Sequence, residues 1–265
     1  MACKDAYKTT DAPQLIQRDI ESLNGDENVR QLWFGSDSRT NANTILQNNI
    51  DHFEWILRNK IYPNFCGRNI VGENALTKEE INFLHKKGCK IAIFFDVDYT
   101  KETYEDGKEI ARIAIERGQE LQLPTGIAIF LEISSEENAT TAFMKGYAES
   151  LLASGYIPGF KANTDAKYSF DREYSRGMQI DKDIFKLCLI WAIAPTVPEF
   201  DRITTTHLIH PDNWKPFAPS GITRKDIAIW QYGKDCHPIQ DDNEKETTFN
   251  LNLVRNDQII ISKMF

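Results

Sequence analysis

The stretch Lys90-Ile91-Ala92-Ile93-Phe94-Phe95-Asp96-Val97-Asp98 is an apolar run that ends in two carboxylates. A continuous apolar run of this length is typical of a strand that is buried on both of its faces. Similar runs occur at 32–37, 126–132, 187–191 and 226–232, with helix-like stretches between them. Strands that alternate with helices form parallel βα units, and in a closed parallel barrel the active site lies at the carboxyl-terminal ends of the strands.

The length and this alternation predict one α/β domain with a single (β/α)8 TIM-type barrel. The chain has 265 residues, which fits a barrel of roughly 250 residues. We expect irregular geometry at strands 5 to 7, where Pro158 interrupts the fifth run. The expected strands are 32–37, 65–70, 90–96, 127–132, 156–160, 186–192, 206–209 and 226–232.

The two ends of the chain have their own patterns. Residues 1–30 are polar and are expected to be an N-terminal extension, so that the barrel domain spans 31–265. The tail alternates over 249–254 and continues in an apolar run at 259–261, which predicts a C-terminal hairpin.

Two helix starts are marked by short motifs. Thr77 with Glu80, and Ser134 with Glu137, have the spacing of a capping box, in which two side chains satisfy backbone amides at the first turn. We therefore expect helices to begin at Thr77 and Ser134.

The charge and the motifs exclude several classes of partner. A net charge of -8 argues against binding to nucleic acid or to an anionic membrane. The start of the chain lacks the apolar segment of a signal peptide, which suggests a cytoplasmic location or a non-classical export route. The sequence contains no H-E-x-x-H, P-loop or G-x-S-x-G motif, and the five cysteines have no metal-binding spacing, so neither a cofactor nor a metal is expected. The oligomeric state is left open.

Short motifs in a defined order point to a family. Gly35-Ser36-Asp37 ends the first strand, Trp230-Gln231-Tyr232 lies in the last strand, and Asn250-Leu251-Asn252-Leu253 lies in the tail. Together with the segment 75–107, they resemble the family 25 lysozyme-like barrels, and more closely the glycoside hydrolase-like domain of bacterial cell-wall and phage-associated proteins. The resemblance covers about 32–262 and implies a barrel that hydrolyses peptidoglycan-like polysaccharide.

The chain departs from the family pattern at two positions. Family 25 lysozymes have D-x-E at the end of strand 4, whereas this chain has Phe130-Leu131-Glu132. The D-x-N of the family tail is here Asn250-Leu251-Asn252. Two of the four carboxylates that the resemblance implies are therefore absent.

Two carboxylates are the catalytic candidates. Glu132 ends an apolar strand, where partial burial would raise its pKa and suit it to donate a proton; alternatively, it pairs with an Arg or Lys of a neighbouring strand. Asp37 would be the base, the nucleophile or a stabilising charge; alternatively, it caps a helix or binds loop amides.

Further residues at strand ends are candidates for binding substrate. Asp96 and Asp98 could bind sugar hydroxyls or a hard cation, and Trp191 could stack on a sugar ring or pack in the core. The full set of binding candidates is Asp96, Asp98, Trp191, Arg68, Gln231 and Asn250.

Three functions remain open at this point. The first is a glycoside hydrolase acting on cell-wall polysaccharide, and the second is a weak or inactive barrel that binds glycan or a protein. The third is a cation-dependent hydrolase that uses Asp37, Asp96 and Asp98.

Overall fold

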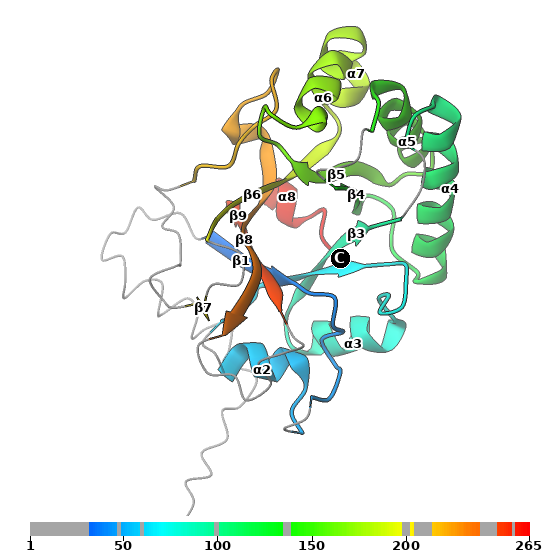
Figure 1. Ribbon diagram of the computed structural model, residues 1–265. Helices are drawn as coiled ribbons and strands as arrows, with labels where there is room; N and C mark the ends of the chain where they lie inside the picture. Colours follow the sequence, from blue (N-terminus) through cyan, green and yellow to red (C-terminus); the bar gives the residue numbers. More distant parts are fainter. Residues whose placement is uncertain are drawn as a thin grey trace, which may run out of the picture.

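The computed structural model describes most of the chain between residue 32 and the C-terminus (Figure 1). The described residues are 32–46, 49–58, 61–97, 101–134, 139–197, 202–203, 214–238, 248–255 and 258–265. The expected extension 1–30, the expected strand at 206–209 and Asp98 lie outside these ranges.

The strands are β1 (Leu32–Asp37), β2 (Phe65–Asn69), β3 (Lys90–Phe95), β4 (Ala128–Ile133), β5 (Ile157–Asn163), β6 (Leu189–Val197), β7 (Arg202–Ile203), β8 (Ile227–Pro238) and β9 (Phe249–Arg255). The helices are α2 (His52–Arg58), α3 (Lys78–Lys86), α4 (Tyr104–Glu120), α5 (Thr141–Ala153), α6 (Ser169–Ile180), α7 (Lys182–Phe185) and α8 (Gln258–Ile261), with a 3₁₀ turn, η3, at Arg224–Asp226.

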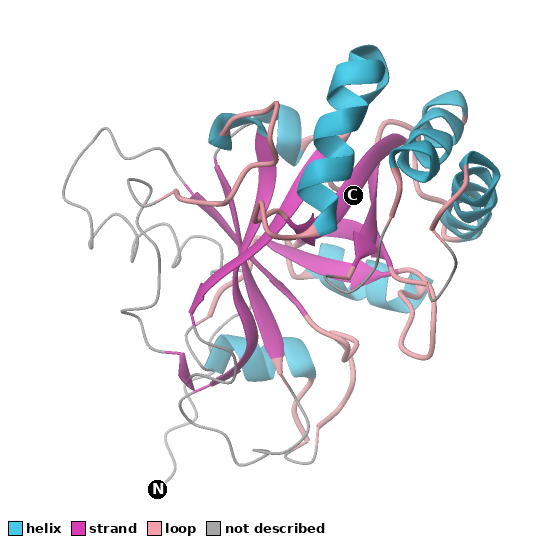
Figure 2. Cartoon of the chain, turned by 45° about the horizontal axis from the view of Figure 1, so that its top comes forward, coloured by secondary structure: helices cyan, strands magenta, loops and turns pink. Residues whose placement is uncertain are grey.

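The strands form a closed barrel, which confirms the expected fold class. In the described part of the chain, β1 to β6 pair in order and in parallel, β6 also pairs in parallel with β8, and β9 closes the ring between β8 and β1. Figure 2 shows these strands crossing at the centre of the molecule with the helices outside them. Eight strands therefore enclose one interior.

The irregularity expected at strands 5 to 7 is absent from the fifth strand and present after it, where the pairing of β6 with β8 has two register shifts. Pro158 lies in β5 and pairs in register with Ile129, so the fifth strand is intact. The alternation of strands and helices holds from β1 to α7 and is not continued in the described residues between β6 and β8. β9 is antiparallel to both of its neighbours, which departs from eight repeated βα units.

The expected C-terminal hairpin is wrong in its second half. β9 forms an antiparallel pair with β8, but 259–261 belongs to the short helix α8 and not to a strand. The apolar residues Ile261 and Met264 pack with the aromatic residues inside the barrel. The backbone of this tail also pairs with Ala128 and Ile91, at the starts of β4 and β3. Through Ile261 and Met264, the tail therefore covers the amino-terminal end of the barrel.

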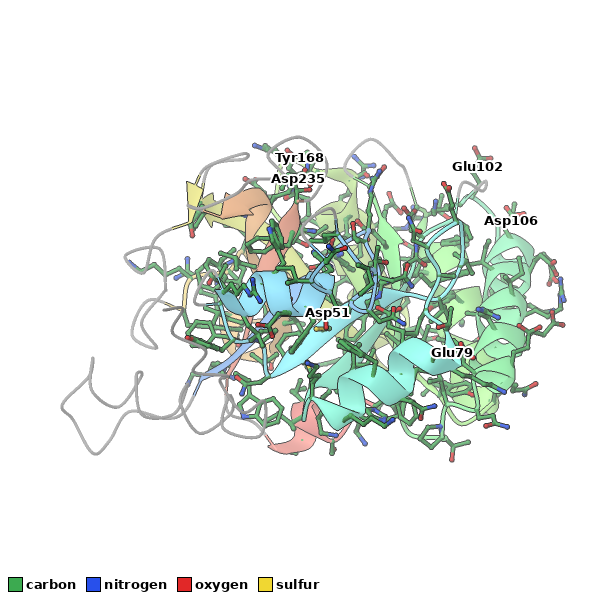
Figure 3. The ribbon with its side chains drawn as sticks, turned by 90° about the horizontal axis from the view of Figure 1, so that it is seen from below. Asp51, Glu79, Glu102, Asp106, Tyr168 and Asp235 are labelled. Carbon is green, nitrogen blue, oxygen red and sulfur yellow. The ribbon has the colours of Figure 1, made fainter. Side chains whose placement is uncertain are left out.

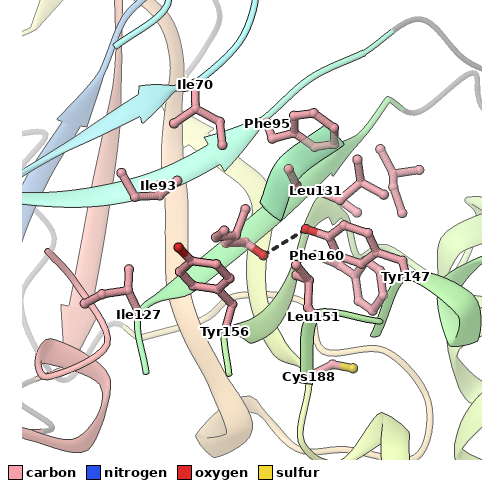
Figure 4. Packing of buried hydrophobic residues seen from close by; sticks show 14 of the residues in the cluster. Ile70, Ile93, Phe95, Ile127, Leu131, Tyr147, Leu151, Tyr156, Phe160 and Cys188 are labelled. Atoms are coloured by element: carbon pink, nitrogen blue, oxygen red, sulfur yellow. Dashed lines mark hydrogen bonds between the residues drawn. The ribbon is translucent and has the colours of Figure 1, made fainter. Parts of the chain in front are cut away.

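Helices cover the outer face of the barrel over two apolar clusters, a large one beneath α3 to α7 and a smaller one between α2 and the strands β8 and β9. Tyr147 of α5 lies against Phe160 of β5, and its hydroxyl donates a hydrogen bond of 3.0 Å to the Ile129 carbonyl of β4 (Figure 4). A buried hydroxyl needs such a partner, because leaving it unpaired would cost about 1–3 kcal/mol. The contact anchors α5 beside the two strands that carry much of the site described below.

The helix starts follow the sequence motifs in part. Thr77 caps α3 by accepting a hydrogen bond of 3.1 Å from the Glu80 amide, but the Glu80 carboxylate turns away into the protein. The helix expected at Ser134 starts instead after its N-cap residue, Thr140. Figure 3 shows Glu79 and Asp106, which lie in the first turns of α3 and α4, where negative charge favours a helix.

Candidate active site

The strand register brings the two catalytic candidates to the same end of the barrel. Glu132 of β4 is paired with Lys161 of β5, and Lys161 is paired with Trp191 of β6. On the other side, Asp37 at the end of β1 is paired with Asn250 of β9. The barrel closes these strands into a ring, so their side chains meet.

Lys161 lies between the two carboxylates. Its Nζ is 3.0 Å from Asp37 Oδ2 and 3.1 Å from Glu132 Oε2. Because both oxygens are within about 3 Å of one nitrogen, they are at most about 6 Å apart. The two predicted carboxylates thus lie close together. Glu132 also has a lysine partner on a neighbouring strand, as its alternative role required.

The ammonium of Lys161 lies over aromatic rings. The Lys161 side chain is buried, and its Nζ is 4.0 Å from the centre of the Phe94 ring and 4.8 Å from that of Trp191. An ammonium removed from water needs opposite charge, and the rings add a cation–π attraction. Burial favours the neutral amine, but Asp37 and Glu132 outweigh it, so the pKa of Lys161 lies above its ordinary value.

Asp37 is enclosed by hydrogen-bond donors. Besides Lys161, it accepts 2.8 Å from Asn250 Nδ2 at Oδ2 and 2.6 Å from Asn252 Nδ2 at Oδ1. Asn252 is in turn oriented by Trp191, whose Nε1 donates to its Oδ1 at 2.9 Å. The Asp37 side chain is only 3% exposed, so substrate cannot reach it in this arrangement.

Glu132 is the accessible member of the cluster. Its side chain is 26% exposed, against 3% for Asp37 and 2% for Lys161. Burial raises the pKa of Glu132 most strongly, Lys161 opposes this, and the negative charges of Asp37 and Asp96 add to the rise. The net pKa lies above that of an ordinary glutamate, which favours retention of the proton that an acid catalyst donates.

The comparisons with known proteins bear on the family of this chain. The model of the Rv2525c-like, glycoside hydrolase-like domain matches residues 62–248, which is more than half of the chain. The chain belongs to this Rv2525c-like family. The match includes Glu132, Lys161 and Trp191, whereas Asp37 and Asn250 lie outside it. The resemblance expected from the sequence motifs is thereby confirmed.

Solved structures similar to this Rv2525c-like domain include an uncharacterised protein of B. stearothermophilus. It has a TM-score of 0.71 and 22% identity, and the match covers 88% of this chain and 100% of that one. At this identity the likeness shows the fold.

Two matches have lower TM-scores. They are the catalytic domain of endolysin ply40 from bacteriophage P40 of Listeria monocytogenes (TM-score 0.48, 15% identity, 88% of this chain, 97% of that one) and a family GH25 lysozyme from Aspergillus fumigatus (0.47, 13%, 88% and 98%). The search of curated proteins found no match.

Trp191 forms the floor of the site in the Rv2525c-like domain and leaves no face for a sugar. Its side chain is fully buried, and it makes edge-to-face contacts with Phe94 at 5.9 Å and Phe130 at 5.5 Å between ring centres. The prediction that it stacks on substrate is therefore corrected: its alternative role, core packing, is the one observed.

Arg68 lies away from the cluster, which corrects its prediction as a binding residue. Its Nε is 2.8 Å from Glu80 Oε1, and both side chains are buried. Its other nitrogens donate to the backbone carbonyls of Ser38, Thr40 and Asn74. Since neighbouring Gly67 faces Asp37 and Trp191 inside the barrel, Arg68 faces outward. The pair Arg68–Glu80 instead holds the loop that follows Asp37.

The remaining predicted residues have mixed positions. Asn250 contacts Asp37, as described above, and Asp96 is exposed at the end of β3. Gln231 is paired with Asn252 across β8 and β9, which places both on the inner face, and its Oε1 has no hydrogen-bond partner among the described residues. Asp98 is outside the described ranges.

Sequence reasoning missed Lys161 and Asn252. A signal for Lys161 was present, because it is the charged residue within the apolar run Ile157–Asn163 and shares a strand face with Gly159. Asn252 was quoted within the tail motif but given no role. Within the described ranges, no cluster of three or more metal-ligating side chains was found, and no helix there is long and apolar enough to span a membrane.

Proposed function

We propose that this domain hydrolyses glycosidic bonds in a bacterial cell-wall polysaccharide of the peptidoglycan type, with Glu132 as the proton donor. The observation that carries the proposal is the position of Glu132. It is a partly exposed carboxyl group at the mouth of the barrel, with a raised pKa and a second carboxylate about 6 Å away or closer. Glycosidases need two carboxyl groups that flank the bond, one of which is protonated.

In this proposal, Glu132 protonates the oxygen of the leaving sugar while the bond to the anomeric carbon breaks. A water molecule then adds its hydroxide to that carbon and gives its remaining proton to the Glu132 carboxylate, which restores the acid, so that each product ends in a hydroxyl group. Positive charge develops on the sugar ring in the transition state. The cluster of Asp37, Glu132 and Lys161 carries a net negative charge when Glu132 is ionised and none when it is protonated, so its field changes as the proton leaves.

The burial of Asp37 selects among its three possible roles. A nucleophile or base must contact the substrate or the attacking water, but Asp37 is 3% exposed and its oxygens accept from Lys161, Asn250 and Asn252. We therefore assign it the stabilising role. The exposed Asp96 and the half-buried Asn250 remain proposed contacts for sugar hydroxyls. Gln231 is only 2% exposed, so the argument that excludes Asp37 from substrate contact excludes Gln231 as well.

The test is the release of reducing ends from purified peptidoglycan. The wild type should release them, and Glu132→Gln should not, because an amide has the shape of the acid but no acidic proton. Glu79→Gln, an exposed change in the first turn of α3, is the matched control and should retain full activity. Equal activity of Glu132→Gln and wild type would refute the assignment of Glu132.

A second candidate, a barrel that binds glycan without cleaving it, is favoured by one feature. Phe130 fills the inner position below Glu132, where the resemblance implies an acid, and it packs against Trp191. Co-sedimentation with insoluble peptidoglycan, with no reducing ends released by the wild type, would support this candidate over the hydrolase.

A further inference from the structure

The buried lysine between the two carboxylates is not needed for a simple pair of glycosidase acids. Lys161 projects from β5 onto a floor made by Phe94 and Trp191, and it holds Asp37 on one side and Glu132 on the other. An isolated ammonium in such surroundings is costly, so its position depends strongly on its counter-charges.

Asp37 fixes where the ammonium lies. Its two oxygens are held by Asn250 and Asn252, and Asn252 is held by the indole of Trp191. This gives a continuous chain of contacts from Trp191 through Asn252 and Asp37 to Lys161. All four members are nearly or fully buried, so this chain of contacts is screened from solvent.

Glu132 lies at the open end of this chain. Three charged groups from other strands act on it: Lys161 on the neighbouring strand β5, Asp37 on β1, and Asp96 just after the neighbouring strand β3. Lys161 favours the ionised form of Glu132, while the two aspartates favour the protonated form and so raise its pKa. Lys161 is also the group that orients the Glu132 carboxylate, through the contact of 3.1 Å.

We propose that Lys161 is the positioning residue of the site, with Asp37 as its buried anchor, and that its ammonium sets both the direction and the proton affinity of Glu132. The proposal rests on the proposed function for its meaning in catalysis. Its structural content, the control of Glu132 by Lys161, is independent of any turnover.

The direct experiment is a carboxyl ¹³C NMR titration of protein labelled at glutamate, with the Glu132 signal assigned by its loss in Glu132→Gln. Lys161→Met removes the cation and retains an unbranched apolar chain. The Glu132 midpoint should then rise by about one pH unit or more, because an opposite charge within about 4–6 Å lowers a carboxyl pKa by that order. Lys167→Met is the control, since Lys167 is exposed and pairs with Asp165, and it should leave the midpoint unchanged.

Lys161→Met alone leaves Asp37 buried without a counter-charge and is expected to be less stable. The double variant Lys161→Met with Asp37→Asn removes both buried charges. Its Glu132 midpoint should also rise, because the effect of Lys161 on the pKa of Glu132 is larger than that of Asp37. A midpoint within about 0.3 units of wild type in the folded double variant would overturn the proposal.

Activity gives a second readout that a purely structural role would not change. If protonated Glu132 is the acid, the fall in rate at high pH should move upward in Lys161→Met, with a lower kcat and little change in KM. A wild type without activity but with the expected NMR shift would refute the hydrolase and leave the control of Glu132 by Lys161 intact. The reverse result would refute this proposal alone: an active wild type, with a Glu132 midpoint that stays the same in Lys161→Met.

Discussion

Glu132 and Lys161 occupy paired positions on the neighbouring strands β4 and β5, and their side chains meet at 3.1 Å. Parallel strands lie about 4.8 Å apart, so paired residues on the inner face are in direct reach of each other. The proton affinity of Glu132 is consequently a property of the barrel register and not of the residue type alone. A shift in register would separate the pair and place other side chains at the mouth.

Trp191 offers a test of whether the aromatic floor binds sugar. Trp191→Phe keeps a ring in the core but removes the indole donor to Asn252 and leaves a cavity. We expect a loss of about 2–4 kcal/mol in the free energy of unfolding, measured by urea denaturation. KM for soluble peptidoglycan fragments should stay within about twofold of wild type, since no face of the ring is exposed.

A large rise in KM at unchanged kcat in Trp191→Phe would mean that the indole contacts substrate after all. Phe95→Leu, a change in the apolar layer between the helices and the outer face of the barrel, serves as the control for a loss of core packing without any change to the site.

The buried pair Arg68–Glu80 is expected to be critical for stability. Glu80 contacts Arg68 at 2.8 Å and accepts 2.7 Å from the Ala42 amide. Glu80→Ala would leave a buried guanidinium without its counter-charge, at a cost of about 3–5 kcal/mol in urea unfolding. The adjacent exposed Glu79→Ala should cost less than about 0.5 kcal/mol. Similar losses of unfolding free energy for the two changes would contradict the stabilising role of the pair Arg68–Glu80.

Substitutions of Asp96 and Asp37 should have different effects on kcat and KM. Asp96→Asn removes an exposed carboxylate at the end of β3, so we expect KM to rise several-fold with a small change in kcat if it binds sugar hydroxyls. Because the charge of Asp96 raises the pKa of Glu132, its loss should also move the high-pH fall in rate slightly downward. Asp37→Asn should lower kcat with little effect on KM, as expected for a buried stabilising charge. Steady-state kinetics over a range of pH would distinguish the two residues. Equal effects of the two substitutions on kcat and KM would contradict the separate roles proposed for them.

The sequence allowed the barrel to be predicted because its signals are local. Apolar runs such as 90–95 and 128–133 mark strands regardless of what they pair with, and their carboxyl-terminal ends must share one side of a parallel barrel. Asp37 and Glu132 could be placed together on this ground alone.

What the sequence did not reveal depends on contacts between distant segments. Lys161 is 124 residues from Asp37, and nothing local indicates that its ammonium fills the space between two acids. The direction of Arg68, outward to Glu80, follows from the inner position of Gly67, which becomes visible only in the closed barrel. The apolar run 259–261 has the composition of a strand, but it folds as the short helix α8, in which Ile261 packs inside the barrel and Ile259 is exposed.

Asn250 is one of the two positions where the chain departs from the pattern expected from the family 25 lysozymes, and a single change there can test the electrostatics of the site. Its Nδ2 donates to Asp37 Oδ2 at 2.8 Å, and its Oδ1 accepts from the Asp235 amide at 2.9 Å. Asn250→Asp retains the second contact and replaces the first with two carboxylates that face each other.

Such a pair holds a proton more tightly than an isolated acid, so at least one of its pKa values is raised. A group with a raised pKa in the folded state contributes stability at low pH, and this contribution is lost as the pH rises through the raised value. The free energy of unfolding of Asn250→Asp should therefore fall relative to wild type as the pH rises above about 4, the ordinary pKa of an aspartate. Extra negative charge near Glu132 should also raise the pKa of Glu132 and move the pH optimum of hydrolysis upward.

Two measurements test these effects: urea unfolding and the rate of reducing-end release, each followed against pH for wild type, Asn250→Asp and Asn250→Ser. Asn250→Ser is the control, since serine removes the amide without adding charge. An Asn250→Asp variant whose stability and rate follow wild type at every pH would show that position 250 does not act on the charges of Asp37 and Glu132.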